Sequence, residues 1–480
     1  MAQVLQIDAE SFYAERDHRT NLRLAQPPEP VRLAVGIAPD WAQYLPGQLA
    51  LYWLCSLIAR MGRRYNRLQI WLPQESASRP NLIRKIPAPT LADAVLMHLR
   101  AADPFGDYAV VDEPGEGGLA VSVGDTPGEA QGLIVRPQGW SAALLERGTL
   151  SPALPDASDM NPVGAAVAAA LGAAAVYQHF NRELVAGYGP QAPLWVSALR
   201  SAATQSAEEA AGWPAEPPLP GEFDIGKWLV VGAGALGANA LEILGHLPGL
   251  RGHVGINDPD VLEISNLNRV VPALLSHLGL PKALVAASCL QGLSVEVAPH
   301  VERYERLRTA GGWKGLPIES YDLILAGVDQ MATRAFVQSD WPRLLVNAGT
   351  RGFTWRVSSH PADTNGACVG CLAGNSQQSY NELRAALRCA VGLPQQAAQQ
   401  EAPMDSYSFV SFFGAAFLAA ESLKQTLGLG ARGRGDIAEA VSLNMGGMTL
   451  RAGRPSERCL CRCDHPVVRQ YRAGKYAGGL

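Results

Sequence analysis

The 480-residue sequence has little charge, and neither sign dominates. Charged residues make up 18% of the chain, and the formal net charge is −4. Proteins that bind nucleic acid usually carry a basic excess, so we expect no nucleic-acid partner. Hydrophobic residues make up 48% of the chain, which is typical of globular domains with sizeable cores. At this length two domains are the better expectation than one.

Long apolar runs and export signals are also scarce. The longest apolar stretch, 163–177, is mostly alanine and glycine, too short and too weakly hydrophobic to span a bilayer. Residues 1–15 include polar and acidic side chains and lack the apolar core of a signal peptide. The eight cysteines do not suggest a disulfide framework, and five of them lie in two C-terminal clusters. We therefore expect a cytoplasmic protein, with no membrane partner, whose clustered cysteines bind metal.

One segment rich in proline and glycine divides the chain. Residues 212–226, GWPAEPPLPGEFDIG, cannot sustain a helix or a central strand. We read the segment as a linker or extended entry between two domains. The sequence thus predicts an N-terminal extension at 1–30, a first domain at 31–205, a linker at 206–222 and a second domain at 223–480.

Both parts of the chain show the pattern of an α/β domain. In the first part, apolar runs at 31–37 and 68–73 flank a helical pattern, which predicts the first unit of a parallel sheet. The second part begins with the same order of strand, helix and strand. Two helices of small residues, 161–180 and 412–428, lie in the last third of each part. We interpret this as two related α/β domains forming a pseudo-dimer; two unrelated α/β domains are the alternative.

A glycine turn follows the first strand of the second part. In VVGAGALG, Gly232 allows a tight turn, Gly234 lets a phosphate approach the backbone, and Gly237 permits close helix packing. The N-terminus of the following helix offers free N–H groups to an anion. Asp258 ends the next strand, where a ribose-binding acid is expected. Dinucleotide dehydrogenases share these features, so a NAD-dependent oxidoreductase is one interpretation.

A second motif favours adenylation over hydride transfer. Residues 257–271, NDPDVLEISNLNRVV, resemble the D-x-D…S-N-L-x-R signature of the ThiF/MoeB and ubiquitin-activating enzymes, which dehydrogenases lack. Lys282 follows Arg269 by 13 residues, and Asp329 ends the apolar strand of YDLILAGVDQ, both as in that family. The chain has no Walker A lysine motif, which disfavours a P-loop ATPase.

Adenylation chemistry explains the residue types in this signature. A carboxylate attacks the α-phosphate of ATP while pyrophosphate leaves, so fixed cations stabilise the developing charge. Carboxylates suit Mg²⁺, which prefers oxygen ligands. The resemblance implies these roles: the triphosphate for Arg269, Lys282 and Asn266, the ribose for Asp258, Mg²⁺ for Asp329, and a supporting place for Asp260.

The first part of the chain lacks this site. Ala38, Pro39 and Asp40 replace the glycine turn; proline removes an N–H donor, and an acid repels phosphate. The resemblance to two-part activating enzymes implies an inactive partner that lends an arginine to the ATP of the active half. Arg19 and Arg23 are the candidates, and the alternative is that both are ordinary surface residues.

The clustered cysteines predict a structural zinc site. Cys368 and Cys371 form a C-x-x-C knuckle, and the second pair comes from the distant cluster Cys459, Cys461 and Cys463. Four thiolates in a tetrahedral array make a closed zinc site. We favour Cys461 and Cys463 for the second pair, with Cys459 in reserve. A redox-active C-x-x-C is the alternative.

Cys389 lies in a polar stretch, where the family has a crossover loop, here at about 372–408. The resemblance implies that a cysteine of this loop receives the activated carboxyl group. Neighbouring arginines favour its thiolate form. The alternative is a small buried residue of an amphipathic helix. Cys55 and Cys289 lie on apolar helix faces and are expected in the core.

The resemblance as a whole implies two Rossmann-like ThiF-type domains, the second with a zinc knuckle, in an activating enzyme for a ubiquitin-like protein. ATP would adenylate the C-terminal glycine of this β-grasp partner. Cys389 would then form a thioester and pass the acyl group to a conjugating enzyme. The fused layout suggests a bacterial antiviral conjugation pathway. Alternatives are a sulfur-carrier adenylyltransferase, which shares the first step, and a scaffold that retains a nucleotide site.

Overall fold

The structure is a computed structural model of the whole chain. It describes all residues except 1–6, 19, 21–28, 116–117, 126–131, 149–159, 183–189, 310–317, 363–365, 374–406, 430–435, 442–443, 453–458, 460–462, 464 and 477–480.

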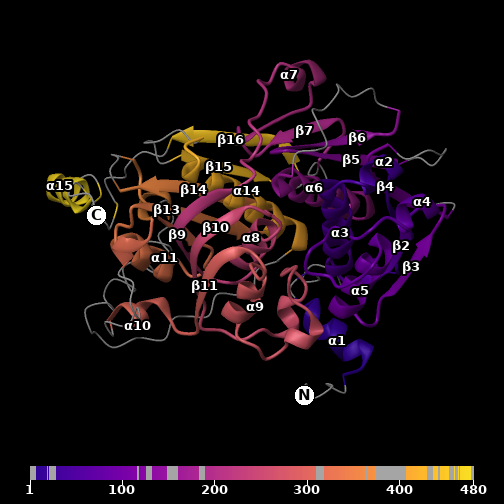
Figure 1. Cartoon of the computed structure of the whole chain (residues 1–480), viewed down its shortest axis with the longest axis horizontal. Coiled ribbons are helices and arrows are strands. Elements are labelled where there is room, and N and C mark those ends of the chain that lie inside the picture. The colour runs from indigo at the N-terminus through magenta and orange to yellow at the C-terminus, as the bar shows by residue number, and fades with distance from the viewer. Residues whose placement is uncertain are drawn as a thin grey trace.

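The described residues form two eight-stranded sheets, one in each half of the chain (Figure 1). The strands of the first sheet are β1 (Leu33–Ile37), β2 (Arg67–Trp71), β3 (Asp107–Val111), β4 (Leu119–Val123), β5 (Gly132–Gln138), β6 (Ser141–Glu146), β7 (Leu194–Ser197) and β8 (Ala202–Thr204). Those of the second are β9 (Phe223–Val231), β10 (Leu250–Asn257), β11 (Ser294–His300), β12 (Leu323–Ala326), β13 (Leu344–Arg351), β14 (Thr354–Pro361), β15 (Asp436–Val441) and β16 (Asn444–Ala452).

The two sheets have the same topology. The first has the order β3-β2-β1-β4-β5-β6-β7-β8, and the second has β11-β10-β9-β12-β13-β14-β15-β16. In each sheet the first five strands in this order pair in parallel and the remaining pairs are antiparallel. The expectation of a mixed α/β fold with two mostly parallel sheets is therefore confirmed.

Helices connect the strands at matching places in the two halves. The first half contains α1 (Ala9–Arg16), α2 (Pro39–Ala42), α3 (Leu45–Arg60), η1 (Arg63–Tyr65), α4 (Gln74–Ala77), α5 (Leu91–Ala102), α6 (Pro162–Phe180) and α7 (Ala207–Ala211). The second contains α8 (Gly237–Leu244), η2 (Ile264–Asn266), η3 (Leu275–His277), α9 (Lys282–Ser288), α10 (Tyr304–Thr309), η4 (Ile318–Ser320), α11 (Met331–Ser339), α12 (Val369–Ala373), α14 (Ser408–Thr426) and α15 (Pro466–Lys475).

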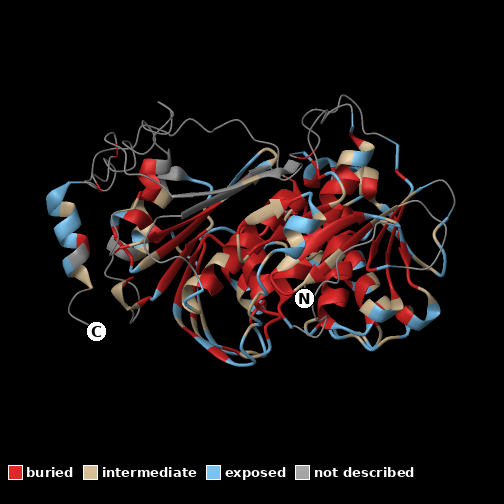
Figure 2. Ribbon diagram, turned by 90° about the horizontal axis from the view of Figure 1, so that it is seen from above, coloured by how far each residue is buried: buried red, intermediate tan, exposed pale blue. Residues whose placement is uncertain are grey.

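The two helices of small residues, α6 and α14, each follow the sixth strand of their half and pack against each other. Small side chains let α6 approach its neighbours closely: a Cβ on Gly164 would lie 2.4 Å from the carbonyl oxygen of Ser141. By length and composition α6 could cross a membrane, but 83% of its apolar window is buried inside the protein. It is therefore a core helix. Figure 2 shows that the buried segments lie in the interior of the molecule.

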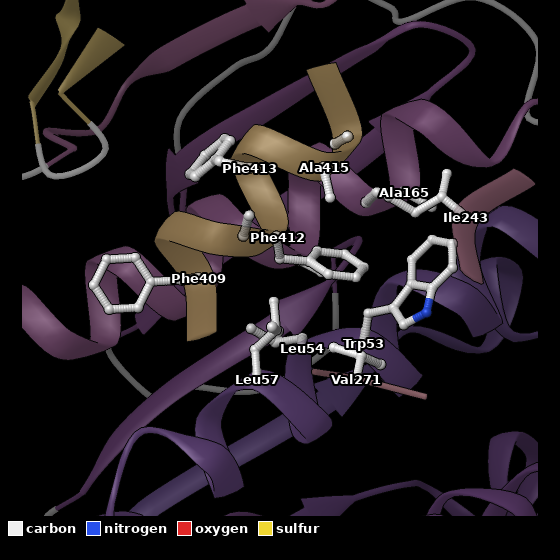
Figure 3. Close-up of a cluster of buried hydrophobic side chains, with 14 of the residues drawn as sticks. Trp53, Leu54, Leu57, Ala165, Ile243, Val271, Phe409, Phe412, Phe413 and Ala415 are labelled. Atoms are coloured by element: carbon white, nitrogen blue, oxygen red, sulfur yellow. The ribbon is translucent and has the colours of Figure 1, made fainter. Parts of the chain in front are cut away.

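Four helices, α3, α6, α8 and α14, join the halves through one continuous hydrophobic core. Figure 3 shows Trp53 of α3 facing Phe412 of α14 and Ile243 of α8, with ring centroids of Trp53 and Phe412 5.4 Å apart. All sixteen residues of α3 are buried. Since the apolar faces of these helices cover each other, each half buries its inner helices only in the presence of the other.

Candidate functional site

The glycine turn lies between β9 and α8. Gly232 has a φ of 92°, and a Cβ there would lie 2.7 Å from Cγ1 of Val328. A Cβ on Gly237 would lie 2.0 Å from the carbonyl oxygen of Gly232. At Gly234, in contrast, a Cβ would have no atom within 4 Å. The turn is therefore tight where the backbone must bend and open where a phosphate would approach.

Asp258 fixes a carboxylate beside this turn. It follows β10 directly and is 6% exposed. Its Oδ2 accepts a hydrogen bond from the Ala233 N–H at 2.7 Å, and its Oδ1 accepts one from the Asp260 N–H at 2.9 Å. Burial raises the pKa of Asp258, although these N–H donors act against the rise. Each oxygen keeps a lone pair for a further donor such as a ribose hydroxyl.

A lysine completes this cluster at the start of α9. The Nζ of Lys282 lies 3.0 Å from Oδ2 of Asp260, and the Lys282 N–H donates to the Asp260 carbonyl at 2.9 Å. A β-bridge between Val261 and Pro281 ties the two segments together. The ammonium group also favours the ionised form of Asp258 by opposing the rise in its pKa. The cation and both carboxylates thus lie at the carboxyl ends of β9 and β10, where ligands of such sheets bind.

The arginine of the S-N-L-x-R signature lies three residues after the end of η2. Nη1 of Arg269 donates to the carbonyl oxygen of Ser265 and to Oδ1 of Asn268, both at 2.7 Å. Asn266 caps η2, because its Oδ1 accepts a hydrogen bond from the Glu263 N–H at 3.1 Å. Of its side chain, the Nδ2 amide is the part left to act as a donor to a nucleotide.

Two asparagines that sequence reasoning missed hold this arginine. Asn268 is fully buried, and its Nδ2 has no hydrogen-bond partner among the described residues. Asn239 of α8 donates from Nδ2 to the Arg269 carbonyl at 2.9 Å and accepts the Val271 N–H at 2.8 Å. Asn268 occupies the variable position of the signature, and Asn239 lies in an otherwise apolar helix pattern. A polar asparagine in that apolar pattern was the available signal for Asn239, whereas the signature leaves the position of Asn268 unspecified and gave no signal for it.

Asp329 lies in the loop after β12, next to the glycine turn. The Gly327 N–H donates to the Val231 carbonyl at 2.9 Å, which joins the two strand ends. Asp329 is exposed. Arg334 donates from Nε to the Val328 carbonyl at 2.7 Å; burial lowers its pKa to about 10, and Asp329 acts against this fall. The structure thus brings Asp329 to the same edge of the sheet as Asp258.

The first half fills the corresponding position with protein atoms. After β1 the chain forms the short helix α2, with Pro39 in its first turn and Asp40 exposed. A Cβ on Gly124, which follows β4, would lie 1.9 Å from Cδ1 of Trp41. The indole of Trp41 thus covers the end of β4. A Cβ on Gly47 of α3 would lie 2.2 Å from the Trp41 carbonyl, so the close approach of helix and turn is kept although the open space is not.

Four cysteines gather at the far end of the second half. The sulfur atoms of Cys368, Cys371, Cys459 and Cys463 lie within 4.8 Å of one another, and all four residues are buried. The Cys368–Cys459 distance is 3.3 Å, Cys371–Cys463 is 3.2 Å and Cys368–Cys371 is 3.7 Å. Thiolates around one Zn²⁺ at about 2.3 Å would be about 3.8 Å apart, so small outward shifts would fit the ion.

Helix α15 supports the cysteine cluster from outside. Nη1 of Arg472 donates to the Cys463 carbonyl at 3.4 Å, and its guanidinium lies 4.5 Å from the ring centroid of Trp341. Burial lowers the pKa of Arg472, while the nearby sulfur atoms oppose the fall. A buried cation here would offset the negative charge of four thiolates around a divalent metal. Figures 1 and 2 show α15 at the periphery of the molecule.

Several sequence predictions fall outside the described residues. Among the described cysteines the reserve candidate, Cys459, joins Cys463 in the cluster, whereas the favoured Cys461 lies outside that part of the chain. The crossover cysteine and the two candidate N-terminal arginines also lie outside it, namely Cys389, Arg19 and Arg23. Cys55 and Cys289 are buried in the core, as expected.

Known families match both halves of the chain. The ThiF family matches residues 224–461, from β9 to the cysteine cluster, and the BilD N-terminal domain matches residues 32–191. The solved structure of Escherichia coli MccB with AMPCPP and MccA has a weak likeness, with 16% identity and a TM-score of 0.37 over 49% of this chain and 66% of that one.

Three curated relatives illustrate the range of the similarity. Protein y4jF of Sinorhizobium fredii, an uncharacterized protein, is 29% identical over 251 residues, which are 52% of this chain and 45% of that protein. The sulfur carrier protein adenylyltransferase of Thermus thermophilus is 29% identical over 252 residues, 50% of this chain and 84% of that protein. The NEDD8-activating enzyme E1 catalytic subunit of Arabidopsis thaliana is 32% identical over 151 residues, 27% and 31% respectively.

The match thus spans less than half the length of y4jF and of the NEDD8-activating subunit. The family match begins within β9, one residue after its start, and includes the glycine turn, the S-N-L-x-R segment and the strand that leads to Asp329. The second half of the chain is therefore a ThiF family domain, and through it the protein belongs to the ThiF/MoeB/ubiquitin-activating-enzyme superfamily.

Proposed function

We propose that this protein is an adenylyltransferase that uses ATP to activate the C-terminal glycine of a ubiquitin-like β-grasp protein. One observation carries the proposal: the open turn at Gly234, the Asp258 carboxylate and the Lys282 ammonium lie together at the ends of β9 and β10. The ThiF match covers these residues, and the names of two relatives, an adenylyltransferase of a sulfur carrier protein and an activating enzyme of NEDD8, support it.

Each residue has a role that its surroundings support. Asp258 would accept hydrogen bonds from the ribose hydroxyls, and N–H groups at the start of α8 would bind phosphate. Lys282 and Arg269 would stabilise charge on the phosphate oxygens as the bond to pyrophosphate breaks. Asp329, an exposed carboxylate at the same edge, suits Mg²⁺, which would neutralise charge on ATP when bound.

The second step of the proposal is a thioester. The thiolate of Cys389 would attack the acyl carbon of the adenylate, the bond to the AMP oxygen would break, and AMP would leave. A conjugating enzyme would then take the acyl group. Support comes from the superfamily and from the position of Cys389 between α12 and α14. The alternative, a sulfur-carrier adenylyltransferase, fits equally well, since the Thermus relative matches over 84% of its length.

The first half would serve as the inactive partner of a built-in pseudo-dimer. The shared strand order and the position of Trp41 support this part of the proposal. We further propose that the four clustered cysteines hold a structural Zn²⁺, and that the protein acts in the cytoplasm, in a bacterial ubiquitin-like conjugation pathway with a role in antiviral defence.

Exchange of labelled pyrophosphate into ATP, with the candidate ubiquitin-like protein present, tests the proposal. We expect exchange in the wild type and in Cys389→Ala, and none in Asp329→Ala. Exchange that survives Asp329→Ala would contradict the site assignment. A reducible adduct with the ubiquitin-like protein should form in the wild type and be lost in Cys389→Ala. Its persistence in that variant would contradict the thioester step, and its absence from an exchanging wild type would favour the sulfur-carrier alternative.

A further inference from the structure

An arginine of the first half reaches into the second half beside the proposed ATP site. Arg60 lies in the last turn of α3 and is 2% exposed. Its Nη1 donates to the Leu267 carbonyl at 2.5 Å, and its Nη2 donates to the carbonyls of Val271 and Ala273 at 2.9 and 2.8 Å. Arg269 lies midway between Leu267 and Val271. The guanidinium of Arg60 therefore holds the backbone on both sides of Arg269.

The same segment is held from its own half. Asn239 of α8 binds the carbonyl of Arg269 and the N–H of Val271. The Arg269 N–H donates to the Asn266 carbonyl at 3.1 Å. With Arg60 on the other side, the backbone on either side of Arg269 is fixed by hydrogen bonds from both halves of the chain. A cation held this firmly is ready to meet a triphosphate without further ordering.

Arg60 carries a buried charge, which costs free energy that a residue needed only for packing would avoid. Burial lowers its pKa to about 10, which leaves it charged at neutral pH. Among the described residues no carboxylate pairs with it, and its hydrogen-bond partners are neutral oxygens. Burying a charge without a counter-ion is unfavourable unless its hydrogen bonds are well satisfied. An apolar residue could fill this position in a core that needed only packing.

A buried chain of side chains orients the guanidinium. Nε of Arg60 donates to Oγ of Ser56 at 3.1 Å, and this oxygen lies 3.0 Å from Nε2 of His98. Nδ1 of His98 lies 3.2 Å from the hydroxyl of Tyr52. Burial, with the charge of Arg60 nearby, lowers the pKa of His98 to about 3, so the ring is neutral. Nε and both terminal nitrogens of Arg60 thus donate hydrogen bonds.

We propose that Arg60 is a positioning residue of the adenylation site, through which the catalytically silent half holds Arg269 in place for the triphosphate of ATP. The inference rests on the proposed function. It assigns to the first half a contribution that does not require it to touch the nucleotide. It also couples the nucleotide site to the interface between the halves, so that ATP binding should stabilise this interface.

The test compares Arg60→Met and Arg60→Lys with the control Arg64→Met in the full chain. Arg64 also donates to a carbonyl, that of Phe180, and to Oδ1 of Asn181, but both partners belong to the first half. Two readouts are needed: KM for ATP and kcat in pyrophosphate exchange, and hydrogen exchange of the amides at 264–273 without ATP. We expect Arg60→Met to raise KM for ATP about tenfold, with a smaller effect on kcat, and to speed amide exchange in this segment.

Arg60→Lys should recover part of both losses, since one ammonium can serve some of the three carbonyls, and Arg64→Met should change neither readout. A folded Arg60→Met protein with KM for ATP within twofold of the wild type and unchanged exchange at 264–273 would overturn the proposal. If Arg60→Met does not fold, Ser56→Ala replaces it, because it removes the partner of Nε, which also contacts His98, and leaves the three carbonyl contacts of the guanidinium in place. It should then raise KM for ATP about two- to fivefold, and an unchanged KM and unchanged amide exchange would overturn the proposal.

Failure of the proposed function has a different signature. A wild type that neither binds ATP nor exchanges pyrophosphate contradicts adenylation itself. The amide exchange at 264–273 still decides whether Arg60 holds the segment, because that readout needs no nucleotide.

Discussion

The two halves of this protein share one strand order and differ at the end of their first strand. In the second half the chain turns through glycines and leaves open space at Gly234. In the first half it forms α2, and Trp41 covers the end of β4. The sheet and its inner helices are thus common to both, whereas the residues at the strand ends are not. One fold thus leaves open space after the first strand of the second half and fills the corresponding end of the first half, and a few residues make this difference.

The first half still contributes to the second across their interface. Lys85 lies 3.1 Å from Glu242 of α8, and Glu242 also contacts His246 at 3.1 Å. Burial alone would raise the pKa of Glu242, but Lys85 and His246 hold it well below its usual value. Removing one partner of such a buried pair leaves an uncompensated charge, so the pair fixes how the halves fit together. A half without the glycine turn can therefore contribute through the contacts that it makes with the other half.

The largest expected effect comes from exchanging the turn residues between the halves. Gly234 and Asp40 each stand three residues after the end of their strand. We expect Gly234→Asp to fold, since open space surrounds the position, and to lower pyrophosphate exchange about 100-fold or more through steric overlap and repulsion of phosphate. Asp40→Gly should leave exchange unchanged. Equal losses in both variants would break the comparison.

The cysteine cluster provides the second test, because only the second half is expected to bind zinc. Cys459→Ser should lower zinc affinity about 10- to 100-fold, as it removes a buried thiolate from the described set. Cys461→Ser is the control, and it should retain one zinc per chain. Zinc content after dialysis against a chelator measures both. Loss of zinc in Cys461→Ser with retention in Cys459→Ser would support Cys461, the ligand favoured from the sequence, over Cys459.

A third test removes the indole of Trp41, which covers the end of β4 in the first half. We expect Trp41→Ala to lower the free energy of unfolding by about 2 kcal/mol, because the half-buried indole packs on Gly124. KM for ATP should stay unchanged, because the first half still lacks the glycine turn without the indole and therefore gains no second nucleotide site. Urea unfolding and pyrophosphate exchange give the two quantities. A second nucleotide site in this variant would show that Trp41 alone silences the first half.

The smallest expected effect concerns pH. Burial lowers the pKa of His98 in the folded protein to about 3, from 6.5 in the unfolded chain. Below pH 6.5 the unfolded state therefore binds a proton that the folded state refuses, and stability falls as the pH falls. From pH 7.5 to 5.5 the loss from this residue is about 1.4 kcal/mol. His98→Gln should lose less stability over that interval than the wild type in paired urea titrations. An identical pH dependence would place His98 outside the buried network.

Local patterns predicted the elements that carry the site. The apolar run before Gly232 gave β9, the helix of small residues gave α6, and the approach of Gly237 to the turn matched the reason given for a glycine there. These features depend on neighbours in sequence, which is why pattern and propensity suffice for them. The full strand order depends instead on pairing between distant strands, which leaves no mark in a single sequence.

The contacts between the halves were beyond the reach of the sequence. Arg60 lies in an apolar helix pattern more than 200 positions before the carbonyls that it binds, so neither spacing nor residue type identifies its partners. The choice among three closely spaced cysteines likewise depends on the path of the backbone around the cysteine cluster, which places Cys459 beside Cys368. Such features are set by tertiary packing and cannot be predicted from local secondary-structure propensity.

The most direct test of the account is the number of ATP molecules that one chain binds. Calorimetric titration of the full chain with Mg²⁺ and a non-hydrolysable ATP analogue measures this number, with Gly234→Asp and Asp40→Gly measured in parallel. The account predicts one site per chain, lost in Gly234→Asp and unchanged in Asp40→Gly. Two sites, no site, or a single site that survives Gly234→Asp would contradict it.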